Sequence, residues 1–376
     1  MNPGRKPIAR LALLTLMACA LGVVPEARCQ DIFGVVTDAE TGEPLPGAHV
    51  FVAGSLAGTA TGTHGRFVLA GLPSGSHRVV ASMLGYAPAA VDTMLFSSDL
   101  EVNFRLNPRV VPLDGLEVVA RTDDRWQKNL ERFTREFLGQ SRTAGAARII
   151  NPEVLDFDRN WWGRLQATAS APLIIENRDL GYRTTYLLKD YDYTPSVLRY
   201  DGDPVFEELE PQSREEAEAW AALREQAFRG SFRHFLLALL ADSTKEQGFH
   251  VYRRPSLNDP NRASMRFPLA PERLLGKADT AGVILRFNGF VEIIYEPELE
   301  EPAFLKKMGT FRAPAAQTSW IRLSDGPTLI DWLGTVVDPY GVTVYGYLAF
   351  ERVGDELPKE YRPPGIHLKT APPSPD

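Results

Sequence analysis

The stretch GVVTDAETGEPLPGAHVFVAGSLAGTATGTHGRFVLAGLPSGSHRVVASMLGY, residues 34–86, consists of short apolar runs separated by glycine-rich turns. Val50 and Val52 alternate with Phe51, which is the period of a half-buried strand. Glycine supplies the positive φ angles that corners need. No helical period occurs before Pro108, so we expect an antiparallel all-β sandwich. The expected core residues are Val35, Val50, Val52, Phe67, Leu69, Val79 and Phe104.

Three polar aromatic residues in this stretch, His64, His77 and Tyr86, raise the question of a functional site. No carboxylate or second histidine stands at the spacing of a metal-ligand set beside them. We therefore expect structural roles. His64 is predicted to lie in a hairpin turn, His77 to open a strand, and Tyr86 to follow a glycine bulge.

Several pieces of this stretch resemble, in order and spacing, the carboxypeptidase-like regulatory domain, a small transthyretin-like (prealbumin-like) sandwich. They are Gly34–Asp38, Pro44–Gly47, Gly58–Thr61, Gly65–Phe67 and Leu84–Tyr86. The resemblance covers residues 31–108 and implies an accessory module. Zinc carboxypeptidases carry their chemistry on a separate domain with a His-x-x-Glu pair, which none of the six histidines here forms. The sequence also contains no serine hydrolase or nucleotide-binding motif, so we expect no enzyme.

The first residues have the features of a secretory signal peptide, predicted over residues 1–29. Arg5, Lys6 and Arg10 precede an uninterrupted apolar run, residues 11–24. Cleavage after Cys29 would leave a mature chain without cysteine. The alternative is a lipoprotein acylated at Cys19. Either route predicts an exported protein of the periplasm or outer membrane. The net charge of −7 argues against a nucleic-acid partner, and no later segment has the length of a transmembrane helix.

A larger second domain is predicted over residues 125–364, after a linker at 109–124 and before a disordered tail at 365–376. Asp124 is expected to cap a helix. Ser213 and Ser231 are expected to cap two further helices that interrupt a series of strands, the last of them in residues 342–353. The predicted architecture is α+β, with a mostly antiparallel sheet and a helical insertion.

Four phrases of this second domain resemble a group of exported Bacteroidota proteins that join such a domain to the same sandwich. They are FLGQSRTAGAARIINPEVLDFD, APLIIENRDLGYRTTYLL, FRGSFRHFLLALLAD and LPKEYRPP, which begin at residues 137, 171, 228 and 357. With the sandwich, this resemblance spans nearly the whole mature chain. It implies a cell-envelope location and no known activity.

Two polar clusters are the candidate binding surface. One contains Glu176, Asn177, Arg178 and Tyr182 at the end of a strand. The other contains Arg229, Ser231, Arg233 and His234 at a helix start, where free backbone N–H groups favour anions. The alternative is that both clusters are caps and ion pairs that hold the helices to the sheet. A Ser231–His234 dyad without an orienting acid is weak evidence for catalysis.

Two other patterns are expected to be structural. Asp156, Asp158 and Asn160 have the spacing of a calcium loop, but the later glycine and glutamate are missing, so we expect a turn. The tryptophans at 161, 162, 320 and 332 could stack on sugars, but tryptophan is more often a core residue.

These observations predict a non-catalytic envelope protein that binds a protein or glycan partner, with no metal and no cofactor. The alternative is a hydrolase of envelope or nutrient polymers that acts through the second domain. A concave pocket holding acids with strongly shifted pKa values would favour the alternative.

Overall fold

The computed structural model describes residues 30–96, 98–109, 124–257, 265–364 and 366. The predicted signal peptide, nearly all of the predicted linker and most of the predicted tail lie outside the described residues. Leader cleavage and acylation of Cys19 therefore stay predictions. The first described residue, Gln30, is also the first residue of β1.

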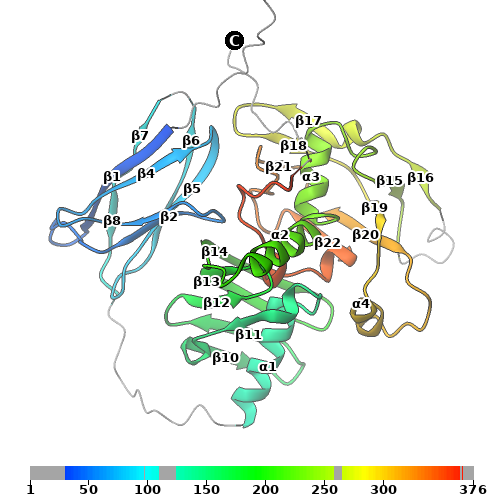
Figure 1. Ribbon diagram of the computed structural model, residues 1–376, viewed down its shortest axis with the longest axis horizontal. Coiled ribbons are helices and arrows are strands. Elements are labelled where there is room, and N and C mark those ends of the chain that lie inside the picture. The colour runs from blue at the N-terminus through cyan, green and yellow to red at the C-terminus, as the bar shows by residue number, and fades with distance from the viewer. Residues whose placement is uncertain (1–29, 97, 110–123, 258–264, 365, 367–376) are drawn as a thin grey trace, which may run out of the picture.

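The N-terminal part is a two-layered sandwich (Figure 1). In one layer, β1 (Gln30–Asp38) lies beside β4 (Arg66–Leu72), β7 (Leu100–Glu101) and β8 (Phe104–Leu106). The other layer has the order β3 (Gly58–Ala60), β2 (His49–Val52), β5 (Gly75–Ser82), β6 (Ala89–Leu95). Between them lies an apolar core with Val50, Phe67 and Phe104. The predicted sandwich is confirmed.

Two details of the sandwich differ from the expectation. β7 and β8 run parallel to β1, so this layer is mixed and not antiparallel throughout. Apolar alternation fixes which face a residue occupies, but it does not fix the direction of the neighbouring strand. Val35 is only half-buried, because Ile32, Gly34 and Val36 occupy the inward positions of β1. The other six predicted core residues belong to the core.

The three polar aromatic residues have structural environments. His64 lies exposed in the turn before β4. His77 is the third residue of β5 and is buried, with Nε2 2.7 Å from the Pro73 carbonyl oxygen, and burial lowers the pKa of His77. The Tyr86 hydroxyl donates to Asp38 Oδ2 at 2.9 Å. Tyr86 follows Gly85 in a turn and not in a strand bulge.

The C-terminal part begins with α1 (Asp124–Leu138), whose Phe133 and Phe137 pack on a six-stranded antiparallel sheet. Asp124 is the first residue of this helix and not the residue before it. The sheet has the order β10 (Leu155–Arg159), β11 (Leu165–Ala169), β13 (Tyr182–Tyr193), β12 (Leu173–Asn177), β9 (Ala147–Ile149), and β14 (Leu198–Glu208) pairs with β13. Two 3-10 turns, η1 (Ala144–Ala146) and η2 (Pro152–Val154), flank β9.

The predicted helical insertion, α2 (Arg214–Phe228) and α3 (Phe232–Leu240), separates this sheet from two others. Ser213 and Ser231 accept hydrogen bonds from the backbone N–H groups of Glu216 and His234, as expected for N-caps. The antiparallel second sheet has the order β16 (Phe267–Pro268), β15 (Phe249–Arg254), β19 (Phe290–Leu299), β20 (Ala316–Leu323), β22 (Val342–Gly346). The third contains β17 (Leu275–Ala278), β18 (Val283–Leu285) and β21 (Thr328–Ile330), and η3 (Pro271–Leu274) and α4 (Pro302–Lys307) connect strands.

One predicted strand ends early. The segment 342–353 was expected to be extended throughout, but β22 stops at Gly346, which has φ +75°. A Cβ at this glycine would lie 2.5 Å from the Thr318 carbonyl oxygen, so the tight corner requires glycine. The chain then forms two 3-10 turns, η4 (Tyr347–Ala349) and η5 (Val353–Asp355), instead of continuing the sheet.

The sandwich contacts the C-terminal part directly. Gly54 N donates to the Pro204 carbonyl at 2.6 Å, and Phe206 N donates to the Ser55 carbonyl at 2.9 Å. Phe51 and Val80 pack against Val205, so β2 is buried on both faces. The sequence predicted one buried face only, because alternation within the sandwich gives no sign of a second covering layer.

Asp203 adds charged contacts to this interface. Its carboxylate accepts from Arg78 of the sandwich at 2.9 Å and from Lys189 of β13 at 2.7 Å. The Asp203 side chain is nearly buried, so the two cations compensate a charge that has been removed from water.

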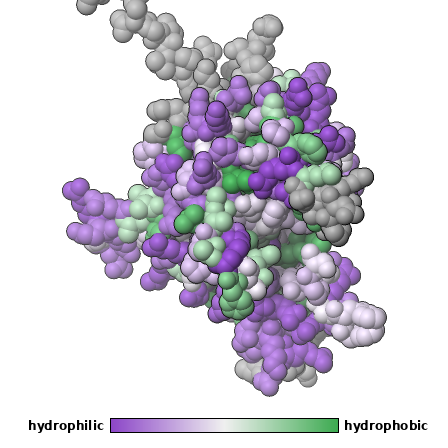
Figure 2. Space-filling view, turned by 90° about the vertical axis from the view of Figure 1, so that its right-hand side faces the viewer, coloured by the Kyte–Doolittle hydropathy of each residue, from purple (hydrophilic) through white to green (hydrophobic). Residues whose placement is uncertain are grey.

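The surface has one feature that contradicts an expectation. Trp161 and Trp162, in the turn between β10 and β11, are 79% and 69% exposed and are not core residues. Their rings lie against each other, with centroids 3.3 Å apart. The turn predicted from Asp156, Asp158 and Asn160 is confined to residues 160–163. Asp156 and Asp158 instead belong to β10, where they pair with Thr168 and Gln166 of β11. On the face shown in Figure 2, hydrophobic residues lie in small groups among hydrophilic ones. None of the helices in the described ranges has the length and apolarity needed to cross a membrane.

Candidate functional site: an acidic pocket

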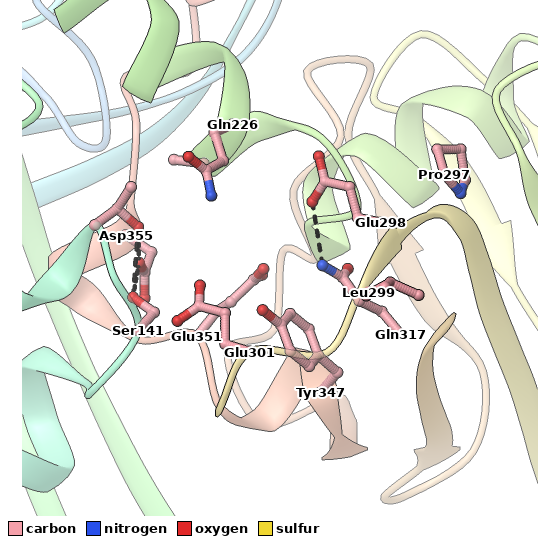
Figure 3. Close-up of a pocket in the computed structure, with 12 residues that line it drawn as sticks. Ser141, Gln226, Pro297, Glu298, Leu299, Glu301, Gln317, Tyr347, Glu351 and Asp355 are labelled. Carbon is pink, nitrogen blue, oxygen red and sulfur yellow. Dashed lines mark hydrogen bonds between the residues drawn. The ribbon is translucent and has the colours of Figure 1, made fainter. Parts of the chain in front are cut away.

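A cavity of about 380 Å³ lies in the C-terminal part, where several stretches of the chain meet, among them the segment after α1 with Ser141 and Thr143 (Figure 3). The end of α2 contributes Gln226, and the end of β19 contributes Glu298. The N-cap of α4 is Glu301, and Gln317 comes from β20. The segment after Gly346 supplies Tyr347 of η4, Asp355 of η5 and Glu351 between the two turns. We call this cavity the acidic pocket.

Asp355 serves the structure of the pocket wall. Its Oδ1 accepts from the hydroxyl groups of Ser141 and Thr143, and its Oδ2 accepts from Arg352 N at 2.9 Å. The first two bonds tie η5 to the segment that follows α1, and the third caps η5 itself. Because its oxygens already have protein donors, Asp355 is not the group most available to a ligand.

Glu298 has one protein donor, and Glu301 has two, Arg142 N and the Tyr347 hydroxyl. Glu298 Oε2 accepts from Gln317 Nε2 at 3.1 Å, and Glu301 Oε2 accepts from Arg142 N at 2.9 Å. A carboxylate offers about four lone-pair sites on two oxygens, so both groups keep unused acceptor capacity. Figure 3 shows both side chains beside the same open space as the Tyr347 hydroxyl.

Glu351 differs from its neighbours because its carboxyl group makes no hydrogen bond or ion pair with any residue in the described ranges. It lines the acidic pocket together with Gln317, whose buried Oε1 has no hydrogen-bond partner in those ranges either. Gln317 is 5% exposed. An unsatisfied buried acceptor costs about 1–3 kcal/mol, so a ligand that donates hydrogen bonds there would recover that cost.

Burial and mutual repulsion raise the pKa values of these acids. Burial, followed by the repulsion of Asp355, Glu298 and Glu301, holds the pKa of Glu351 well above its usual range. Burial raises the pKa of Glu298 to about 7, although the Gln317 amide and Arg229 act in the opposite direction. Burial also raises the pKa of Glu301. The pocket therefore changes its charge near neutral pH.

The arrangement does not fit a metal ion. In the portions of the chain that the structure describes, no three His, Cys, Asp or Glu side chains are placed to hold one. A cation that brings its own hydrogen-bond donors fits better, because the pocket offers carboxyl and amide oxygens.

The first predicted cluster is engaged within the protein. Glu176 pairs with Arg178 at 2.7 Å and with Arg183 at 3.3 Å. Asn177 is buried, donates to the carbonyls of Thr143 and Gly354, and accepts from two backbone N–H groups. The guanidinium of Arg224 lies 4.0 Å from the ring centroid of buried Tyr182.

The second predicted cluster is similarly engaged. Arg229 pairs with Glu225 at 2.7 Å. Arg233 donates to four carbonyls, those of Leu333, Pro358, Lys359 and Tyr361. His234 is fully buried. Its Nδ1 accepts from Gly230 N and its Nε2 faces Gln247 Oε1, and burial lowers the pKa of His234 to about 4. Ser231 caps α3, and its hydroxyl donates to the Phe228 carbonyl.

Two of the predicted residues act on residues of the acidic pocket without lining it themselves. Asn177 holds the backbone of Thr143 and Gly354, next to the pocket wall, and the charge of Arg229 acts on Glu298. A Cβ at Gly230, which lies between Arg229 and Ser231, would be 2.6 Å from Gln317 Oε1. Ligand binding by the predicted clusters themselves stays a prediction.

The pocket acids were missed from the sequence because they occur in two segments 50 residues apart. Glu298 and Glu301 belong to the acid-rich stretch YEPELEEP, whose composition predicts a solvated surface. Glu351 lies in the segment 342–353, which was predicted to be a strand, and Asp355 lies just beyond that segment. Gly346 within the predicted strand could have indicated a corner, but the sequence does not show that this glycine has a positive φ.

Comparison with known proteins identifies the N-terminal part only. Residues 31–107 match the family of the carboxypeptidase regulatory-like domain. The match confirms the predicted domain and covers less than half of the chain. No curated protein matches the sequence.

Several solved structures are similar to part of this chain, at low identity and low TM-score. The pilus 2b backbone protein of group B streptococcus is 16% identical, with TM-score 0.20, over 22% of this chain and 42% of that one. The 5-hydroxyisourate hydrolase of Klebsiella pneumoniae is 20% identical, with TM-score 0.19, over 21% and 91%. A putative carbohydrate binding protein of Bacteroides uniformis is 12% identical, with TM-score 0.19, over 43% and 61%. The chain thus spans less than half of the pilus protein.

Proposed function

We propose that the protein is exported to the cell envelope and binds, without catalysing a reaction, a protein or glycan partner through a protonated amine held in the acidic pocket. A lysine side chain supplies such an amine on a protein, and an amino sugar supplies it on a glycan. The leader sequence supports export, and the charged pocket supports binding.

The observation that carries this proposal is the environment of Glu351. Its carboxyl group borders the cavity, has no hydrogen-bond donor in the described ranges, and has carboxyl groups as neighbours. Repulsion among these groups disfavours the charged form, and a positive ligand removes that repulsion. An ammonium group has three donors, which match the oxygens of Glu351, Glu298 and Gln317.

Calorimetric titration of the mature chain tests the proposal. The probes are Nα-acetyl-lysine methylamide and glucosamine, with glucose as the neutral control. We expect both amines to bind and glucose not to bind. Glu351→Gln should weaken amine binding at least about tenfold, because a charged hydrogen bond contributes about 1.5–3 kcal/mol. Glu296→Gln, an exposed change two residues from Glu298, should have no effect.

The pH dependence of binding is a second readout for the lysine probe, because its amine stays charged between pH 8 and pH 5.5. Binding should weaken from pH 8 to pH 5.5, because protonation of Glu298, with its pKa of about 7, removes negative charge from the pocket. Equal binding of glucose and glucosamine, or equal losses in Glu296→Gln and Glu351→Gln, would contradict the proposal.

A second candidate function is hydrolysis of a glycan. A glutamate whose pKa is raised to about 7 lies in one cavity with further carboxyl groups, and glycosidases need an acid of this kind beside a second carboxylate. If this function holds, amino-sugar oligosaccharides are cleaved, and Glu298→Gln abolishes turnover but retains binding. Absence of cleavage with intact binding supports the non-catalytic proposal.

A further inference from the structure

A second concavity, of about 230 Å³, lies at the end of the second sheet of the C-terminal part and carries positive charge. Three arginines line it, together with an amide and an apolar floor. The polar members are Arg253, Arg273, Arg286 and Asn288. None of its lining residues is acidic, in a protein whose net charge is −7. We call it the arginine concavity.

Three separate elements bring the arginines together. Arg253, near the end of β15, pairs with Val291 of β19 in the sheet register. Arg273 belongs to η3, and Arg286 directly follows β18. The Arg286 N–H donates to the Leu274 carbonyl at 2.8 Å, which holds these two segments together. Backbone pairing therefore determines the convergence of the three side chains.

A comparison with the next residue shows that these arginines lack protein partners. Arg254 points to the opposite face of β15 and pairs with the buried carboxylate of Glu292 at 2.6 Å. The side chains of Arg253, Arg273 and Arg286 make no hydrogen bond or ion pair with any residue in the ranges that the structure describes. All three are exposed, so a ligand can reach them.

We propose that the arginine concavity binds a phosphoryl, sulfate or carboxylate group carried on a small aromatic or apolar body. Guanidinium groups match the oxygens of such groups with paired, parallel hydrogen bonds. An anion there also relieves the repulsion among three like charges. This site is separate from the acidic pocket and does not depend on its function.

The apolar floor defines the rest of the ligand. Leu274 and Val291 are each 1% exposed, and Phe287 is half-buried at the rim. A volume of about 230 Å³ is below the range of about 300–1,000 Å³ typical of drug-sized ligands. The concavity therefore suits one anionic group with a short body, and not an extended chain enclosed over its whole length.

Titration calorimetry of the mature chain with phenyl phosphate tests this proposal. Phenyl sulfate and benzoate identify the preferred anion, inorganic phosphate measures the contribution of the ring, and benzyl alcohol is the neutral control. We expect phenyl phosphate to bind more tightly than inorganic phosphate, benzyl alcohol not to bind, and affinity to fall with added salt.

Variants localise the binding. Arg253→Gln, Arg273→Gln and Arg286→Gln should each weaken phenyl phosphate binding about tenfold or more, as expected for one lost charged hydrogen bond. The matched control is Arg322→Gln, which removes an exposed charge from the opposite face of the same sheet. It should leave affinity unchanged, as should Glu351→Gln. Melting temperatures confirm that each variant is folded.

Three results would overturn the proposal. The first is the absence of phenyl phosphate binding. The second is a loss of affinity in Arg322→Gln equal to that in the three variants of the arginine concavity. The third is an affinity for benzyl alcohol equal to that for phenyl phosphate.

Discussion

Arg233 and Glu351 are both ionisable groups in the interior of the C-terminal part, but they differ in what surrounds them. Arg233 donates to four backbone carbonyls, whereas Glu351 lacks a donor among the described residues. Burial perturbs both: it lowers the pKa of Arg233 to about 9 and raises that of Glu351. A perturbed pKa alone therefore does not separate a structural residue from a functional one. The two residues differ instead in the hydrogen-bonding capacity that the protein leaves unused at Glu351.

The largest effect is expected at Arg233. Arg233→Met should destabilise the protein by about 3–5 kcal/mol, because it leaves buried carbonyls without their donor. Urea unfolding measures the change. A loss below about 1 kcal/mol would mean that this cation is dispensable to the structure, and the comparison with Glu351 would fail.

The next effect is expected at Asn177, whose amide group is fully used within the protein. Asn177→Ala should cost about 2–3 kcal/mol, since two carbonyls and two N–H groups lose their partner. The same unfolding assay applies. Asn177→Asp sharpens the test, because it keeps the acceptor and loses the donors, and it should also destabilise.

Glu298→Gln should stabilise the protein at alkaline pH, in contrast to the two destabilising changes above. The folded-state pKa of about 7 exceeds the ordinary value of 4.5, so protonation favours the folded state. That stability is present below about pH 4.5 and is lost as pH rises through 7. The stability of Glu298→Gln relative to the natural protein should therefore increase from pH 5 to pH 8. A constant difference, or the same trend in Glu296→Gln, would contradict this expectation.

The smallest effect is expected at the exposed tryptophans. Trp161→Ala should change the unfolding free energy by less than about 0.5 kcal/mol, because the side chain is 79% exposed. Phe67→Ala in the sandwich core is the contrasting control, with an expected loss of about 3–5 kcal/mol. Similar losses in both variants would show that the tryptophan pair belongs to a packed structure.

The sandwich was predictable because its turns and strands are local features. The glycines between strands and the alternation at Val50, Val52, Phe67 and Leu69 each depend on a few neighbouring residues. Val35 was placed wrongly because it belongs to a run of adjacent apolar residues, in which alternation is ambiguous. The parallel pairing of β8 with β1 joins residues almost 70 positions apart, and local patterns do not report such pairing.

The helix caps at Ser213 and Ser231 were predictable for the same local reason. The acidic pocket was not, because Glu298 and Glu351 come together only through the β19–β20–β22 sheet and the corner at Gly346. The predicted clusters consisted of adjacent residues, which favours caps and ion pairs. The arginine concavity escaped notice since Arg253, Arg273 and Arg286 share no local motif.

The interface around Gly54, Ser55 and Asp203 affects how the protein responds to proteolytic cleavage and to mechanical tension. Main-chain hydrogen bonds, ion pairs and the buried side chains of Phe51 and Val80 join the two halves there. A protease that cut the chain between residues 110 and 123 would therefore leave a nicked but associated pair, not two free fragments. Tension applied across the two halves would likewise load this contact, because it joins them directly.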